Sequence, residues 1–264
     1  MNHLRGVYTI WYRDILRFWH DKMRMISSIT FPLLFLFVFG SGLSARMGVL
    51  GPGIDFTQFI FPGIIGMTVL MSSFMAGVSV VWDREFGFLK EVLVAPISRA
   101  SVAVGKTLGS ATVALLQGLL ILLFAPLIGV SFTASTLLVL LPLMFLLAVS
   151  LGSLGVLLAT RIRSMEAFQA TMQMLMFPMV FLSGAFFPLQ GLPAWMNIMV
   201  KFNPATYGIA PIRQIILGTD PNLSYSYNIN LFGQTLTVWN EVAILAIFGV
   251  IVILLAMWSF SNQE

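Results

Sequence analysis

The chain has 264 residues, of which 58% are hydrophobic and only 9% are charged. A soluble domain usually carries about 25% charged residues, so we expect lipid to be the solvent for most of this surface. The absence of cysteine excludes disulfides and thiolate sites, and both histidines, His3 and His20, precede the first apolar segment. The net charge of +4 is small and its distribution follows membrane topology, so we predict no nucleic-acid partner.

An amphipathic helix is predicted within residues 1–24. At 100° per residue its polar face carries Thr9, Arg13, Arg17, His20 and Arg24. Its opposite face carries Tyr8, Trp11, Ile15, Phe18 and Trp19. Such a helix suits the cytoplasmic interface of a membrane, either as a simple anchor or as a lever that a cytoplasmic partner moves. The candidate residues for that role are Arg13, Arg17, Trp19 and Arg24.

Apolar stretches long enough to cross about 30 Å of hydrocarbon follow at 25–43, 59–81, 107–129, 137–159, 167–187 and 242–260. The first also resembles a signal-peptide core, but the long charged segment before it favours an uncleaved span. The fifth is the least regular, because it contains Gln169, Gln173 and Pro178. The pattern predicts an all-α integral membrane protein with six spans, forming a single transmembrane domain over residues 1–264.

The basic residues predict how the spans are oriented. Eleven of the fourteen Lys and Arg residues flank one side of the predicted spans, and only Arg46, Lys201 and Arg213 fall on the other. The positive-inside rule then places both termini in the cytoplasm, which requires an even number of spans. We therefore expect a multi-pass protein of the cell's inner (plasma) membrane.

The region 188–240, after the fifth span, contains five prolines. Its middle part is too polar for a span and too apolar for an ordinary loop. Two short helices that dip part-way into the outer leaflet would explain this composition, because irregular backbone at that depth must face protein or a water-filled cavity.

Several kinds of chemistry are disfavoured. All ten acidic residues lie in flanks or loops, so an ion-coupled carrier has no evident ion site within the spans. The string Gly152-Ser153-Leu154-Gly155 superficially resembles a nucleophile motif, but no span contains a histidine base, and helix packing explains its small residues better. No GxxxxGK[ST] loop is present. We predict no catalytic, cofactor or metal site, and no ATP hydrolysis by this chain itself.

The segment 82–106 is the most distinctive cytoplasmic loop. The second span runs into Asp83-Arg84-Glu85, an amphipathic stretch follows, and Pro96 stops the helix. The loop reads REFGFLKEVLVAPISR from Arg84 to Arg99, followed by Gly105-Lys106. A second motif, Asn203-Pro204-Ala205-Thr206-Tyr207, is followed by Arg213 and Gly218.

These two motifs, together with the amphipathic N-terminal helix and the six spans, resemble the type-2 permeases, a family of ABC transporter membrane domains. The resemblance covers nearly the whole chain. It implies that two such subunits form a pathway at their interface, and that each docks on a separate ATP-binding cassette subunit that binds ATP and Mg. The likeness is greater to the drug-exporter branch of the family.

The resemblance also assigns roles to residues. The helix Arg84–Pro96 would be the coupling helix that contacts the cassette subunit, through Arg84, Glu85, Phe86, Gly87, Leu89, Lys90, Glu91 and Pro96. The alternative is that its charges only solvate an interfacial helix. The outer motif would comprise Asn203, Pro204, Tyr207 and Arg213.

Members of this family export drugs, lipid-linked polysaccharides or other amphiphiles. The candidate pathway residues in the fifth span are Gln169, Met172, Gln173 and Met176. Methionine suits varied apolar ligands, although glutamines in spans often only join helices. With 23 Phe but 5 Tyr and 6 Trp, the chain has few rings suited to stacking sugars, which favours a hydrophobic small molecule or lipid. Two alternatives remain, namely a polysaccharide or glycolipid exporter and a non-transporting membrane scaffold.

Overall fold

The computed structural model describes residues 3–47, 49–51, 54–87, 98–162, 164–189, 191–218, 229–231 and 234–261. Within these ranges the regular structure is helical apart from two small hairpins. Its long helices are α1 (His3–His20), α2 (Lys22–Met47), α3 (Phe56–Glu85), α5 (Arg99–Leu122), α6 (Ala134–Arg161), α7 (Met165–Phe181) and α11 (Val238–Ser261). Shorter elements are η1 (Ala125–Ile128), α8 (Ala194–Phe202), α9 (Thr206–Leu217), and the pairs β1 (Val49–Gly51) with β2 (Ile54–Asp55) and β3 (Asn230–Leu231) with β4 (Gln234–Thr235).

Five helices among the described residues, α2, α3, α5, α6 and α11, are long and apolar enough to cross a membrane. They correspond to five of the six predicted spans. The remaining predicted span, the fifth in chain order, corresponds to α7, which has 17 residues and ends at Phe181, earlier than expected. The predicted span 107–129 also differs, because α5 ends at Leu122 and the chain then turns through η1 to Gly129, whose φ of 75° favours glycine.

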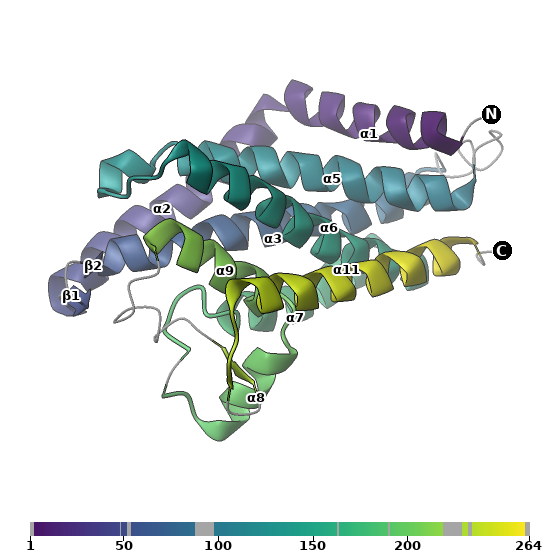
Figure 1. The fold of residues 1–264 in the computed structure, drawn as a ribbon. Coiled ribbons are helices and arrows are strands. Elements are labelled where there is room, and N and C mark those ends of the chain that lie inside the picture. The colour runs from purple at the N-terminus through teal and green to yellow at the C-terminus, as the bar shows by residue number, and fades with distance from the viewer. Residues whose placement is uncertain are drawn as a thin grey trace.

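The long helices lie side by side, with α1 along α5, and the first and last helices reach the same end of the bundle (Figure 1). There the guanidinium of Arg99 donates to the carbonyl of Ser261 at 3.4 Å. The core surrounds α3, which packs against α2, α5, α6, α7 and α9. Local caps fix where helices begin: Asp55 and Gln58 form a capping box at α3, and the hydroxyl of Ser98 accepts from the amide of Ser101 at α5.

Small residues let the two central helices approach closely, as predicted for Gly152–Gly155. A Cβ added to Gly77 of α3 would lie 2.3 Å from the carbonyl oxygen of Gly155 on α6. A Cβ on Gly152 would lie 3.3 Å from the carbonyl oxygen of Ser73. These glycines therefore serve helix packing, which is typical of membrane helices.

Candidate functional site

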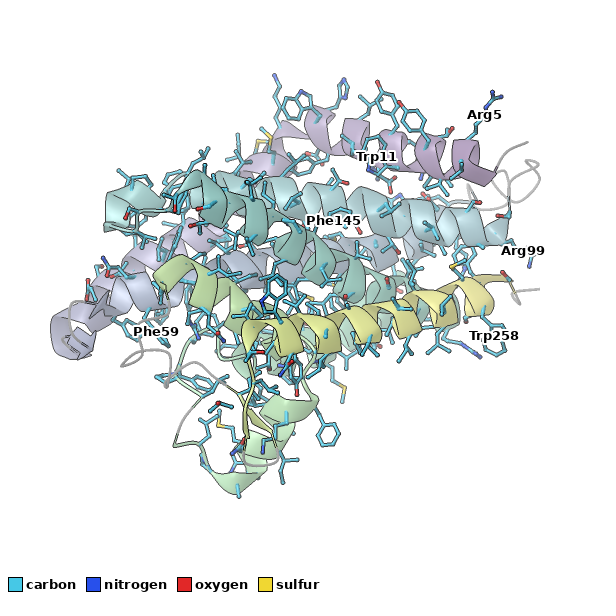
Figure 2. The ribbon with its side chains drawn as sticks, viewed as in Figure 1. Arg5, Trp11, Phe59, Arg99, Phe145 and Trp258 are labelled. Carbon is cyan, nitrogen blue, oxygen red and sulfur yellow. The ribbon has the colours of Figure 1, made fainter. Side chains whose placement is uncertain are left out.

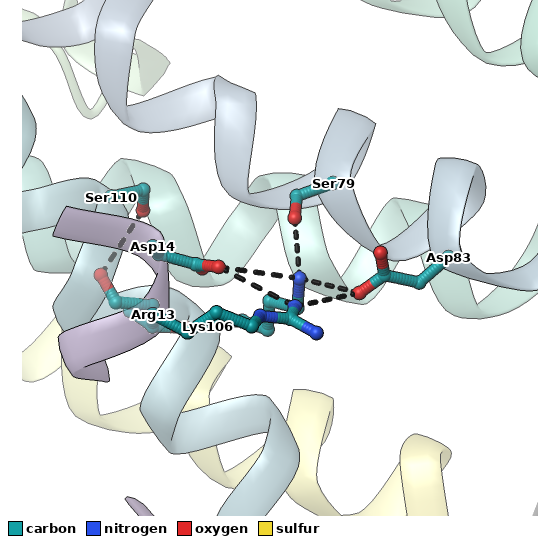
Figure 3. A network of polar contacts seen from close by, with 7 residues as sticks. Arg13, Asp14, Ser79, Asp83, Lys106 and Ser110 are labelled. Atoms are coloured by element: carbon teal, nitrogen blue, oxygen red, sulfur yellow. Dashed lines mark hydrogen bonds and ion pairs between the residues drawn. The ribbon is translucent and has the colours of Figure 1, made fainter. Parts of the chain in front are cut away.

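Four charged side chains from three helices meet between α1, α3 and α5 (Figure 3). The ammonium of Lys106 on α5 lies 2.6 Å from Asp83 of α3 and 3.7 Å from Asp14 of α1. It also donates to the hydroxyl of Ser79. The guanidinium of Arg13 bridges the same two carboxylates, at 3.0 Å from Asp83 and 3.4 Å from Asp14. We call Arg13, Asp14, Asp83 and Lys106 the ion network.

The charges of Lys106 and Asp83 in this network are buried, and removing them from solvent costs free energy. Lys106 is 2% exposed and the Asp83 side chain 7%, so their charges are almost completely removed from solvent. Such a pair persists only if each member keeps its partners, because an unpaired buried charge is strongly destabilising. Arg13 remains 43% exposed. Its burial lowers the pKa of Arg13, but the carboxylates of Asp83 and Asp14 outweigh this effect and hold the pKa above its usual value.

Two glycines four residues apart position α1 against α5. A Cβ on Gly105 would lie 2.9 Å from Cβ of Ile10, and one on Gly109 would lie 3.0 Å from Cβ of Asp14. Each step of four residues along α5 thus matches four along α1, so the two helices run in the same direction. The indole of Trp11 adds a hydrogen bond of 3.0 Å to the hydroxyl of Thr112. This packing brings Asp14 beside Lys106.

In the structure, the buried and exposed residues of the N-terminal helix do not follow the predicted apolar and polar faces. Phe18 is buried, whereas Tyr8 and Trp19, expected on the same apolar face, are exposed. Arg13, expected on the polar face, turns toward Asp83. Arg17 is exposed, and the side chain of Arg24 lies outside the described residues.

The predicted coupling segment begins directly after the ion network. Arg84 donates from Nη1 to the carbonyl of Ile162, just beyond α6, at 3.0 Å. Glu85 ends α3, and Gly87 follows with a φ of 80° that allows the chain to change direction. The exposed ring of Phe86 packs on Trp82, with centroids 4.8 Å apart. The other residues predicted for this role lie outside the described residues: Leu89, Lys90, Glu91 and Pro96.

The predicted outer motif joins α7, α8 and α9. Asn203 donates to the carbonyl of Met179 at 2.8 Å and accepts from the amide of Ala205 at 3.1 Å. Pro204 lies in the turn between α8 and α9, and the hydroxyl of Tyr207 donates to the carbonyl of Lys201 at 2.7 Å. These contacts give the motif a structural role, because they fix the turn between two short helices.

Arg213 extends the same region inward from α9. Its side chain is 1% exposed, and its Nη2 donates to the carbonyl of Ala185 at 2.8 Å. The guanidinium carbon lies 4.2 Å from the centre of the Phe59 ring, within the range of a cation–π contact. Arg213 therefore connects α9 to α3 and to the segment that follows α7.

The sequence comparisons agree with this architecture. The family described as "ABC-2 type transporter" matches residues 5–217, which include the ion network, the start of the coupling segment and the outer motif. The chain belongs to the ABC-2 type transporter family.

Similar curated proteins include two transport permeases and a nodulation protein. "Putative transport permease ycf38" of Cyanophora paradoxa is 32% identical over 80% of this chain and 71% of its own. "Inner membrane transport permease YadH" of Escherichia coli (strain K12) is 28% identical over 80% of this chain and 82% of its own. "Nodulation protein J" of Rhizobium leguminosarum bv. trifolii is 28% identical over 74% of each chain.

The candidate pathway residues of this ABC-2 type permease lie on α7, one face of which is exposed. Gln169 and Gln173 are exposed, Met172 is partly buried and Met176 is buried. Neither glutamine makes a side-chain hydrogen bond to another residue that the structure describes. Within these parts of the chain, the glutamines therefore do not join α7 to another helix. The same face exposes Phe177.

Two buried polar pairs of the permease are not predicted from the sequence. The sequence predicts Asp83 in a cytoplasmic loop and Lys106 in the Gly105-Lys106 motif, although the spacing Gly105-x-x-x-Gly109 is typical of a helix packed closely against another. Glu241 is expected from the sequence to flank a span, yet it is fully buried, and its carboxylate accepts from the side-chain amide of Gln214 at 3.2 Å. Hydropathy alone gives no signal for this second pair.

Proposed function

We propose that this chain is the membrane subunit of an ATP-driven exporter of hydrophobic small molecules or lipids, with ATP and Mg bound by a separate cassette subunit. Membership of the ABC-2 type family and the transport names of its relatives support the class. The observation that carries the mechanism is the connection of the coupling segment to the bundle. Asp83 and Arg84 are adjacent in the chain, and their contacts join the end of α3 to α1, α5 and the end of α6.

In this proposal α7 is the fifth of six spans, both termini are cytoplasmic, and α8 and α9 enter the outer leaflet. Two copies form the pathway, with the open face of α7 toward the partner or the cargo. Movement of the cassette subunit is passed through the Arg84–Pro96 helix to α3. ATP drives export because it binds one conformation of the assembly better than the other. Exposed Phe177 and Met174 beside the glutamines favour apolar cargo.

The test is co-purification of the chain with its cassette partner, followed by ATPase measurement in lipid discs with candidate hydrophobic drugs. The test variant combines Glu85→Arg with Leu89→Asp. The control combines Lys201→Glu with Ile198→Asp on α8, which makes a similar change away from the coupling segment. We expect drug-stimulated ATPase in the wild type and control, and loss of assembly or stimulation in the test variant. Wild-type behaviour of the test variant would reject the coupling assignment, and absence of any cassette partner would reject the exporter proposal.

A further inference from the structure

A cavity of about 270 Å³ lies between α1, α3 and α5, beside the ion network. Its α3 wall is one face of the helix from Ser72 to Trp82, and α1 contributes Arg17 and Phe18. We propose that this cavity holds one acyl chain of an anionic phospholipid, whose headgroup pairs with Arg17. The proposal concerns a resident lipid and does not depend on which cargo the protein exports.

The size and lining favour a hydrocarbon chain. Pockets for drug-sized ligands usually have volumes of about 300–1,000 Å³, so this cavity lies just below that range. Ser72 and Trp82 are ten residues apart, which corresponds to about 15 Å along α3. The lining is mostly apolar, with Phe18 on α1, Met75 on α3 and Val113 on α5. A narrow apolar ligand aligned with α3 fits this shape.

The charges favour an anionic headgroup. In the ion network, Arg13 and Lys106 balance the carboxylates of Asp14 and Asp83. Arg17 then adds one positive charge at the cavity, where it is exposed and has no ion pair with any other residue that the structure describes. Basic residues near a membrane surface attract anionic lipids.

One exposed residue of the cavity wall is also typical of a membrane interface. Trp82 lines the cavity and is 42% exposed, and tryptophan prefers the boundary between headgroups and hydrocarbon. Asp14 and Ser79 belong both to the cavity wall and to the contacts around Lys106. A bound chain would therefore support the packing of α1 against α3 next to the buried charges.

Native mass spectrometry of the purified full-length chain tests the proposal. The protein is incubated in mild detergent with phosphatidylglycerol or with phosphatidylcholine, and retained lipid is counted per chain. Arg17→Gln removes the cation, with Arg5→Gln as its control, because Arg5 lies on the same helix but points away from the bundle (Figure 2). Ser72→Phe fills the cavity, with Met71→Phe as its control, because exposed Met71 does not line it.

We expect the wild type and both controls to retain one phosphatidylglycerol in preference to phosphatidylcholine. Arg17→Gln should weaken phosphatidylglycerol retention about fivefold, the factor that one basic residue near an anionic surface provides. Ser72→Phe should abolish retention of both lipids while the protein stays monodisperse. Equal loss in Arg5→Gln, equal retention of the two lipids by the wild type, or displacement of phosphatidylglycerol by a hydrophobic drug would each overturn the proposal. If Ser72→Phe does not fold, the Arg17→Gln comparison decides.

Discussion

The ammonium of Lys106 lies 2.6 Å from the carboxylate of Asp83, and the two residues belong to different helices that enclose them almost completely. Ser79 accepts a further hydrogen bond from Lys106, and Asp14 supplies a second carboxylate. This contact fixes α5 to α3 one residue before the predicted coupling helix begins. Its disruption should therefore change both the stability of the bundle and the geometry at the end of α3.

A double-mutant cycle measures the Lys106–Asp83 pair. Lys106→Met alone should destabilise the protein by about 3–5 kcal/mol, because it leaves buried carboxylates without their main partner. Asp83→Asn should also destabilise it, since Asp14 is then the one carboxylate of the ion network left beside Lys106, at the longer distance of 3.7 Å. The combined variant should regain much of the loss, because both charges are removed. Thermal unfolding of the detergent-solubilised protein gives the comparison, and strictly additive losses would contradict direct pairing.

Close packing of α1 on α5 predicts a specific effect at Gly109. Gly109→Leu should displace α1, because even a Cβ at this position lies 3.0 Å from Cβ of Asp14. Trypsin should then cleave after Arg13 or Arg17 several times faster, as local opening of α1 becomes more frequent. Gly42→Leu on α2 is the matched control, because no atom lies within 4 Å of a Cβ there. Similar cleavage rates in both variants would show that α1 does not depend on this contact.

Asn203 provides a test of the outer turn. Asn203→Ala should destabilise the protein by about 1–3 kcal/mol, because the change leaves the buried carbonyl of Met179 and the amide of Ala205 without their side-chain partner. Asn203→Asp should be less disruptive at the Ala205 amide but cannot donate to Met179. Asn197→Ala on α8, where the side chain is exposed, should unfold at the wild-type temperature. If Asn203→Ala unfolds at the wild-type temperature, the motif does not have the structural role that we assign to it.

Hydropathy was sufficient to predict five of the membrane-length helices, because a run of about 20 apolar residues is typical of a membrane-spanning helix. It predicted α7 less well, since that helix ends at Phe181 and the chain then turns. The ion network could not be predicted from composition. Asp83 lies in the last turn of α3 and Lys106 lies about two turns into α5, and α1 packs over both of them. That arrangement depends on the approach of Ile10 to Gly105, a tertiary contact.

Arg84 tests whether the contact between α3 and the end of α6 transmits motion. Arg84→Gln removes the guanidinium that donates to the carbonyl of Ile162 at 3.0 Å, and it leaves Asp83 and Lys106 in place. If movement of the coupling segment reaches α6 through this bond, the variant should still assemble with the cassette subunit and hydrolyse ATP. However, it should export several times fewer hydrophobic dye molecules per ATP from proteoliposomes. Arg161→Gln, an exposed basic residue at the end of α6, controls for loss of charge in the same area. Equal dye export per ATP in the wild type and Arg84→Gln would mean that motion reaches the bundle by another route. The ion network at Asp83 would then be the next contact to test, because it joins the same end of α3 to α1 and α5.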